Sequence, residues 1–214
     1  TNTYGTLEQL KACFTPFLER DDVIAICIAT RADCISDEIL SYLDEMCQTK
    51  DIWIELGLQS VYDETALAMN RGHTYEEFTD CIARLQKTHV KICVHLINGL
   101  PNETEEMMIH SAKTVGALPI HALKIHMLHL LKGTALYARY QEKPFPLLSQ
   151  EEYVELVVKQ LEVIDPHIII QRLTGDGIDA LLAAPLWTKR KVCVLNDIDK
   201  RMRSLNTWQG KKYK

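Results

Sequence analysis

Short apolar runs alternate with longer amphipathic segments along this chain. The apolar runs lie at residues 23–30, 52–58, 91–97, 122–129 and 167–174. Runs of this length that are rich in β-branched residues are typical of strands buried on both faces. The segments between them have helical spacing, so the pattern predicts an α/β fold with a mostly parallel sheet and right-handed crossovers. A barrel and an open doubly wound sheet both fit this alternation.

Serine and threonine residues mark the predicted helix starts. Thr6, Ser36, Thr74 and Ser149 each precede an amphipathic stretch, and the last two begin capping boxes with a glutamate three positions on. Residues 138–148 contain two prolines and are predicted to form a loop. The predicted helices are 7–19, 36–47, 63–69, 74–88, one capped by Asn102 or Thr104 that runs to 116, 149–164 and 188–205.

Composition places the chain among ordinary globular proteins. It has 214 residues, of which 47% are hydrophobic and 25% charged. No apolar run reaches the roughly 20 residues of a membrane span, and no signal peptide is visible. The seven cysteines show no C-x-x-C spacing, and several lie inside apolar runs, as reduced thiols do. We therefore expect a cytoplasmic protein that does not act at a membrane.

The charge is unevenly distributed. From Lys189 onward the chain has nine Lys and Arg against two Asp, a net charge of +7, whereas the whole chain carries −5. Such a basic end is typical of nucleic-acid contacts, although a solvated helix face has the same composition.

Polar side chains follow all five apolar runs near their carboxyl ends. In parallel α/β folds these ends meet at one edge, where ligands bind, so we expect a shared active-site rim. A strand places His126 and His129 on opposite faces, so no metal pair is predicted. The chain also lacks phosphate-binding loops and a G-x-S-x-G elbow. The rim candidates are Thr30, Arg31, Asp33, Gln59, Ser60, His95, Asn98, Lys124, His126, His129, Arg172, Thr174 and Asp176.

Three motifs in this region resemble a known family. Gly57-Leu-Gln-Ser60, Asn70-Arg-Gly-His73 and the segment from His95 to Thr104 resemble the core of radical S-adenosylmethionine (radical SAM) enzymes. The branch includes coproporphyrinogen dehydrogenase-like and elongator-like proteins. Further segments look like one bacterial subfamily of Fe-S oxidoreductase type, and together the motifs span essentially the whole chain. These further segments are residues 28–33, 132–134, 172–176 and 184–187.

The resemblance implies a partial (β/α) barrel and a defined chemistry. In the family a C-x3-C-x2-C loop holds a 4Fe-4S cluster, an electron donor such as flavodoxin or ferredoxin reduces it, and S-adenosylmethionine is cleaved to a 5′-deoxyadenosyl radical. That radical abstracts hydrogen from the substrate. The present sequence has no such cysteine triad, so we expect a fragment that lacks the cluster loop and is inactive by itself.

The resemblance also implies roles for individual residues. Gln59 and Arg71 match positions at the methionine carboxylate and ribose of the cofactor, and His95 stands where relatives often have a ribose-binding Asp. The other residues assigned to the cofactor are Thr30, Arg31, Asp33, Asn98 and Gly99. The residues assigned to the substrate are Lys124, His126, Arg172, Thr174 and Asp176, and no catalytic residue is assigned.

Several functional alternatives remain open from the sequence. Because the branch includes RNA-modifying enzymes and the C-terminus is basic, the first hypothesis is modification of a tRNA base side chain. The alternatives are a radical enzyme for a small metabolite such as a porphyrin, and a cluster-less barrel that acts as a binding module. We expect the barrel at residues 1–176 and a basic helical extension at 177–214. An unpaired sheet edge at 23–30 predicts a homodimer, or cover by the N-terminal helix.

Overall fold

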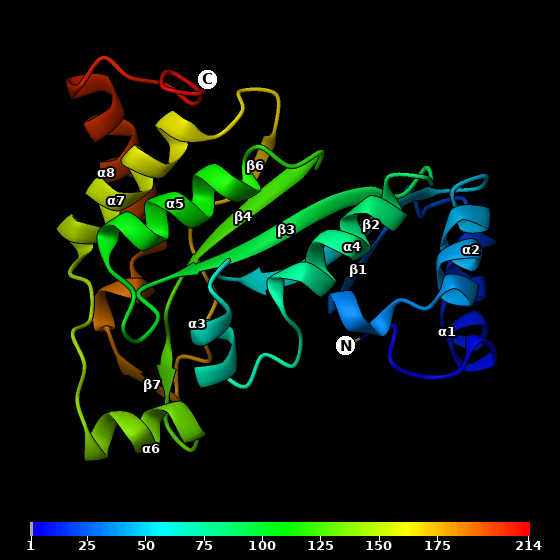
Figure 1. Ribbon diagram of the computed structural model, residues 1–214, viewed down its shortest axis with the longest axis horizontal. Coiled ribbons are helices and arrows are strands. Elements are labelled where there is room, and N and C mark those ends of the chain that lie inside the picture. The colour runs from blue at the N-terminus through cyan, green and yellow to red at the C-terminus, as the bar shows by residue number, and fades with distance from the viewer. Residues whose placement is uncertain (1) are drawn as a thin grey trace.

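Five parallel strands form the central sheet of the computed structural model, which describes residues 2–214. They pair in the order β1-β2-β3-β4-β6, and the sheet stays open, with β1 and β6 at its edges (Figure 1). The α/β fold and the parallel sheet are therefore confirmed, in the form of a partial barrel. The strands are β1 (Ala25–Thr30), β2 (Asp51–Gln59), β3 (Lys91–Asn98), β4 (Ala122–Met127), β5 (Leu130–Leu131), β6 (Ile169–Arg172) and β7 (Leu182–Ala184).

Helices connect the strands and cover one face of the sheet, with α4, α5 and α7 in front of it in Figure 1. The predicted cap residues are confirmed, since the side chains of Thr6, Ser36, Thr74, Thr104 and Ser149 each accept a backbone N–H of the first turn. The helices are α1 (Leu7–Leu18), α2 (Asp37–Met46), α3 (Asp63–Ala68), α4 (Tyr75–Leu85), α5 (Glu105–Val115), α6 (Ala135–Glu142), α7 (Gln150–Val163) and α8 (Lys191–Ser204).

The two faces of the sheet differ in their side chains. On β2, Ile54, Leu56 and Leu58 are buried under the helices, whereas Glu55 and Gly57 between them are only partly buried. We call the helix-covered side the outer face and the other side the inner face. Because side chains alternate along a strand, the inner face carries Glu55 of β2, His95 of β3, and Lys124 and His126 of β4.

Two segments after β4 differ from the prediction. The loop predicted at 138–148 is wrong in its first part, because α6 occupies Ala135–Glu142 and begins at Thr134, whose side chain accepts the N–H of Tyr137. The prolines follow the end of that helix. The strand predicted at 122–129 ends at Met127 and is followed by β5, which pairs antiparallel with β7.

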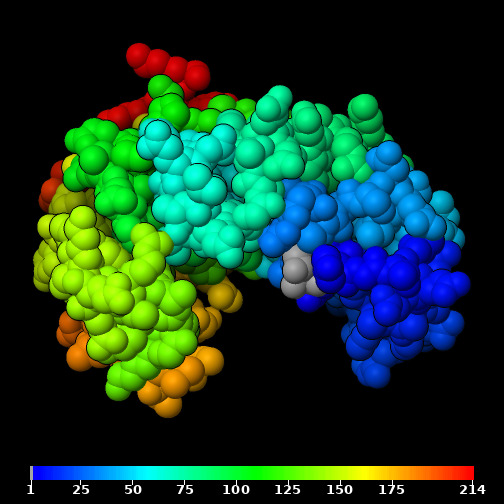
Figure 2. Space-filling model, turned by 60° about the horizontal axis from the view of Figure 1, so that its bottom comes forward, coloured from blue at the N-terminus to red at the C-terminus, as the bar shows by residue number. Residues whose placement is uncertain are grey.

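The molecule has the shape of an arch (Figure 2). The N-terminal helices, coloured blue, form one limb, and the segment that contains α6, coloured yellow-green, forms the other. A small second core holds the α6 limb, in which Leu100, Leu128 and Leu130 pack against Tyr137 and Phe145. A depression lies between the two limbs.

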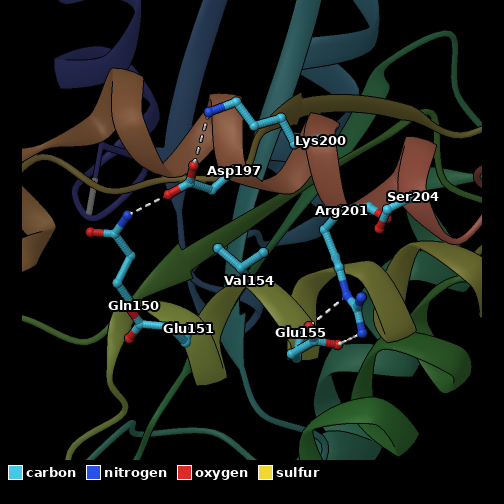
Figure 3. Close-up of a pocket in the computed structure, with 8 residues that line it drawn as sticks. All are labelled: Gln150, Glu151, Val154, Glu155, Asp197, Lys200, Arg201 and Ser204. Carbon is cyan, nitrogen blue, oxygen red and sulfur yellow. Dashed lines mark hydrogen bonds and ion pairs between the residues drawn. The ribbon is translucent and has the colours of Figure 1, made fainter.

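The C-terminal helix α8 packs on α7. Val194 and Ile198 are buried in this contact. Figure 3 shows two polar contacts between these helices, on either side of Val154. The Gln150 amide donates to Asp197, and the Arg201 guanidinium pairs with Glu155. Many basic groups of this region thus already have partners, and the division of the chain after residue 176 stays a prediction.

The β1 edge is partly covered by the residues that precede α1. The backbone N–H of Asn2 donates to the carbonyl of Ala29 at 3.1 Å, and the buried hydroxyl of Thr3 bonds that of Thr30. Thr1 lies outside the described residues. The helices of residues 2–214 include none that is long and apolar enough to cross a membrane.

Candidate functional site

The carboxyl ends of β1, β2 and β3 enclose a polar cavity of about 290 Å³. Seven of its eight lining residues come from these strands or directly follow them, and Arg71 comes from the turn after α3. The predicted rim therefore exists at this edge. The lining residues are Ala29, Thr30, Arg31, Glu55, Gly57, Gln59, Arg71 and His95.

Arg71 binds the end of β2. Its Nε donates to the carbonyl of Gly57 at 2.6 Å, and its Nη2 reaches the same oxygen. Burial lowers the pKa of Arg71, and the charge of Arg31 lowers it further. A Cβ on Gly57 would lie 2.7 Å from the Gln59 amide nitrogen and 2.8 Å from Arg71 Nη2, so only glycine leaves room for both side chains.

Gln59 has an unusual backbone and an unsatisfied side chain. The register of β2 and β3 shifts between Gly57 and Gln59, and Gln59 takes a φ of 76°, in the left-handed region that only glycine adopts freely. Its side-chain oxygen is buried and has no hydrogen-bond partner within the described chain. Strain and an orphaned buried polar atom at one residue indicate a place for a ligand.

A second cavity of about 130 Å³ adjoins the first and shares Gln59 and Arg71 with it. Its remaining lining is mainly apolar and comes from β2, α3, β3 and their loops. Beside it, Ser60 donates a hydrogen bond to the Glu103 carboxylate, and burial raises the pKa of that carboxyl. The lining residues are Leu58, Gln59, Ser60, Thr65, Ala66, Met69, Arg71, Ile97 and Leu100.

Arg31 and Asp33 form an ion pair at the mouth of the first cavity. Arg31 Nε donates to Asp33 Oδ1 at 2.9 Å, and Nη2 bonds the other oxygen. Burial of Asp33 opposes ionisation, but the Arg31 hydrogen bond and charge hold the pKa of this carboxyl below its ordinary value. The Arg31 guanidinium also packs on Gly72, where a Cβ would lie 2.9 Å from Nη1. Both residues therefore stand at the rim, as predicted.

An ionic cluster occupies the inner face next to this cavity. Glu55 Oε2 lies 2.6 Å from Lys124 Nζ and 3.1 Å from His95 Nε2, and each of the three side chains is less than a fifth exposed. Burial alone would raise the pKa of Glu55, but the hydrogen bond and charge of Lys124 outweigh it and leave the pKa lowered. Glu55 is therefore a carboxylate at neutral pH.

Two histidines beside this cluster stay uncharged at neutral pH. The rings of His95 and His126 lie 5.1 Å apart, on neighbouring strands. Burial lowers the pKa of His95 to about 4, although the Glu55 charge opposes it. Burial, helped by the charges of Arg172 and Lys124, lowers the pKa of His126 to about 4 as well. His126 Nε2 is buried and has no partner in residues 2–214.

The side chain of Asn98 lies on the outer face, away from both cavities. It exchanges two hydrogen bonds with Gln160 of α7, at 2.8 and 2.9 Å, and both residues are almost completely buried. Gly99 follows with a φ of +86° and turns the chain at the strand end. Of this segment, Ile97 and Leu100 line the smaller cavity, whereas Asn98 does not.

The predicted residues from the last strand lie further out. Arg172 pairs with Lys124 in the sheet register, but its guanidinium contacts Asp176 at 3.2 Å, and Lys191 also binds Asp176. Thr174 is buried and lines a different cavity, of about 530 Å³, between β6 and α8. Of the five residues assigned to the substrate, the structure brings Lys124 and His126 into the inner-face cluster.

Sequence reasoning missed two acidic residues of the site. Glu55 lies inside an apolar run, and only the strand register shows that it stands next to Lys124 and His95. Glu103 belongs to a motif that was recognised, but its contact with Ser60 joins residues 43 positions apart. A charged residue in the middle of a buried strand was the available signal for Glu55.

Comparisons with known proteins match this architecture. The family model of the radical SAM superfamily matches residues 6–115, and that of the radical SAM C-terminal domain matches residues 120–204. The chain belongs to the radical SAM superfamily. Its confirmed features are thus the family, the partial barrel and the parallel sheet.

Individual relatives agree with this membership. YtqA of Bacillus subtilis is 43% identical over 211 residues, which cover 99% of this chain and 66% of YtqA. A tRNA uridine(34) acetyltransferase of Methanocaldococcus infernus is 26% identical over 156 residues, 72% of this chain and 29% of that protein. The chain therefore spans less than two thirds of the length of these relatives.

A solved structure has a similar fold. The structure of the archaeal Methanocaldococcus infernus Elp3 with an N-terminal deletion matches with a TM-score of 0.73 and 21% identity. The match covers 87% of this chain and 43% of that one. At this identity the likeness shows the fold.

The residues present fit one of the two groups that the radical SAM family uses. A polar cavity with an orphaned amide oxygen, joined to a smaller apolar cavity, suits a ligand with a charged methionyl and ribose part and a flat adenine, as S-adenosylmethionine has. The 4Fe-4S cluster does not fit, because residues 2–214 contain no group of three His, Cys, Asp or Glu side chains placed for a metal.

Proposed function

We propose that this chain is the cofactor- and substrate-binding part of a radical SAM enzyme that modifies a base side chain of tRNA. The observation that supports it best is the arrangement of two adjoining cavities beside a cluster of ionised and neutral polar side chains on the inner face. Cofactor and substrate would then meet above one sheet. The cluster ligands, the electron donor and therefore the activity belong to the full-length protein.

The proposed cofactor contacts follow from the two cavities. When bound, S-adenosylmethionine supplies a primary carbon radical that abstracts hydrogen from the substrate. Gln59 offers its unpaired amide oxygen to an N–H or O–H group of the cofactor, and Arg71 keeps the end of β2 in the bulged form that presents this oxygen. Arg31 and Asp33 close the polar side, and Leu100 and Ile97 line the adenine side.

The inner-face cluster is the proposed substrate site. Lys124, His95 and His126 face the same side of the sheet, at adjacent register positions. The cluster lies next to the polar cavity, because Glu55 and His95 belong to the cluster and also line the cavity. A group held there lies next to the proposed cofactor site, as hydrogen abstraction requires.

The tRNA hypothesis rests on the relative named as a tRNA uridine(34) acetyltransferase and on the open arch, which leaves room for a polymer. The basic C-terminus supports it less than its composition suggests. Lys191, Arg201 and Lys212 pair with Asp176, Glu155 and Glu162, respectively. We therefore place the proposed phosphate contacts on the α6 limb, where the exposed Lys132 and Lys143 have no side-chain partner among the described residues.

Binding experiments with the full-length protein test this placement. We expect the K132A/K143A variant to bind bulk tRNA more weakly at every salt concentration and to lower the slope of log K against log salt by about 1 per lysine. The matched variant K211A/K214A removes two charges from the C-terminus and should leave the affinity within about twofold. A loss in K211A/K214A with unchanged binding in K132A/K143A would place the RNA on the tail instead.

Turnover decides between the tRNA and metabolite alternatives. In the full-length enzyme with its cluster and a reductant, bulk tRNA should stimulate formation of 5′-deoxyadenosine, and nuclease digestion should release a nucleoside of changed mass. If an RNA-free extract of small molecules stimulates the reaction and tRNA does not, the enzyme acts on a metabolite. If neither stimulates it and S-adenosylmethionine does not bind, the binding-module alternative holds.

A further inference from the structure

Glu55 stands at the centre of the inner-face cluster, and no motif assigns it a role. Its Oε2 atom serves two neighbours, Lys124 Nζ at 2.6 Å and His95 Nε2 at 3.1 Å. The three residues come from β2, β3 and β4, and the strand register places His95 directly beside Lys124. Glu55 therefore links three adjacent strands on the inner face.

The carboxylate of Glu55 determines where a neutral His95 carries its proton. A carboxylate has no hydrogen to donate, so a nitrogen that approaches it within hydrogen-bond distance must be the one with the N–H. In a neutral imidazole the other nitrogen is then an acceptor. With Glu55 beside Nε2, Nδ1 of His95 has a free lone pair.

Nδ1 is also the nitrogen that is left for a ligand. No hydrogen bond engages it within residues 2–214. The buried nitrogen of this ring is Nε2, which lies 3.1 Å from Glu55 Oε2 without the alignment of a hydrogen bond. His95 lines the polar cavity of about 290 Å³, as Gln59 and Arg71 also do. The ring thus belongs both to the wall of the proposed cofactor cavity and to the cluster.

We propose that Glu55 is a positioning residue that holds His95 with its proton on Nε2, so that Nδ1 accepts a hydrogen bond from an N–H or O–H group of the substrate. The substrate class is a molecule with a neutral polar group that donates there. This proposal rests on the proposed function in taking the inner face as the substrate site, and its tautomer part stands independently.

A general base is the competing role for His95, and the cluster disfavours it. Lys124 binds the same carboxylate oxygen and brings a positive charge next to the ring. Burial and Lys124 both lower the pKa of His95. An imidazole in this setting keeps its neutral form, so it accepts a hydrogen bond without taking the proton.

The tautomer is measured directly by nitrogen NMR of the full-length protein labelled at histidine with ¹⁵N. We expect the wild type to show His95 protonated on Nε2. In E55Q, Lys124 can only donate and therefore takes the amide oxygen. The amide NH2 then faces Nε2 as a donor, so the proton should move to Nδ1. K124M is the matched control, because it removes the other partner of Glu55 and should leave the His95 proton on Nε2.

Kinetics then test the consequence for substrate. With bulk tRNA as the probe, we expect E55Q to raise KM about 10-fold, the effect of one lost hydrogen bond in a buried site. E55D keeps a carboxylate and should recover part of this loss. An unchanged His95 tautomer in folded E55Q, or a KM equal to that of the wild type, would overturn the proposal.

The two failures can be told apart. If tRNA does not stimulate the wild-type enzyme, the proposed function is wrong, and the NMR signal of His95 still decides whether Glu55 sets the tautomer. If E55Q does not fold, the tautomer in E55D decides: the proton on Nε2 supports the proposal, and the proton on Nδ1 overturns it.

Discussion

Near the carboxyl ends of the central strands, buried polar groups differ in their hydrogen bonding between the outer and inner faces of the sheet. On the outer face, Asn98 and Gln160 exchange two hydrogen bonds, and Gln160 also donates to the carbonyl of Met108. On the inner face, the Gln59 oxygen, His95 Nε2 and His126 Nε2 are buried without a hydrogen-bond partner in the described chain. The Asn98 and Gln160 amides are satisfied within the protein, whereas the three inner-face atoms are not.

This difference separates structural from functional polar residues. A buried polar atom without a partner costs free energy, so a folded protein retains it only where something else is gained. The amide pair under the helices therefore contributes to stability. The unpaired atoms of Gln59 and His126 instead lower the stability of the unliganded protein, and a ligand that hydrogen-bonds to them would remove this loss.

The largest expected effect comes from breaking the outer pair. N98A leaves the buried Gln160 amide without its partner, and we expect a loss of about 3 kcal/mol in the free energy of unfolding. Urea denaturation of the variant and the wild type measures it. Q48A is the control, because Gln48 is exposed and its side chain makes no hydrogen bond in the described chain, so it should change stability by less than about 0.5 kcal/mol.

A double variant sharpens this result. N98A/Q160A removes both amides, so it should cost clearly less than the sum of the two single variants. Additive losses would show that the two side chains contribute independently.

The next largest effect is a pH dependence from the inner face. His126 has a folded pKa of about 4, below the ordinary value of 6.5, so the unfolded chain binds the proton more tightly between these values. Stability from this group is complete above pH 6.5 and is lost as the pH falls toward 4, by up to about 2 kcal/mol at pH 5.

Denaturation at pH 7 and pH 5 measures this effect. H126Q has no titrating group, so its loss of stability over this interval should be smaller than that of the wild type. H89Q serves as the control, because His89 is exposed and its ring sits beside Asp44 on the surface. An equal pH dependence in wild type and H126Q would contradict the burial of a neutral His126.

A smaller change in stability is expected at Gln59, together with a change in ligand binding of the opposite sign. Q59G relieves the left-handed backbone strain and removes the unpaired oxygen, so we expect a gain of about 1 kcal/mol in stability. The same change should weaken binding of S-adenosylmethionine to the full-length enzyme at least about 10-fold. Denaturation and calorimetric titration measure the two quantities, and a loss in both would contradict a ligand role for this strained residue.

The smallest effect is expected in the C-terminal helix. R201A breaks the half-exposed ion pair with Glu155 and should cost less than about 1 kcal/mol. Its affinity for bulk tRNA should equal that of the wild type. A steep loss of RNA binding would instead show that Arg201 leaves Glu155 to contact phosphate.

The fold could be predicted from the sequence because its local signals agree. Capping residues defined most helix starts, and β-branched runs defined the five strands of the sheet. Helix α6 was not predicted because Pro144 and Pro146 follow it closely. The predicted loop included residues 138–142, which contain no proline and belong to the helix. The two-residue strand β5 is too short to have a pattern of its own.

The site could be predicted only in part. The strand-end rule located the rim, but it did not say which face each side chain occupies. Alternation along β3 puts His95 on the inner face and Asn98 on the outer face, a distinction that period-two counting offers. The position of Glu55 beside Lys124 depends on the register of three strands, which no local signal encodes.

The amide pair has a mechanical consequence for the site. Gln160 belongs to α7, and through Asn98 it holds the last residue of β3, immediately before the turn at Gly99. Gly99 in turn leads to Leu100, which lines the smaller cavity. The position of α7 therefore helps to set the position of one wall of that cavity.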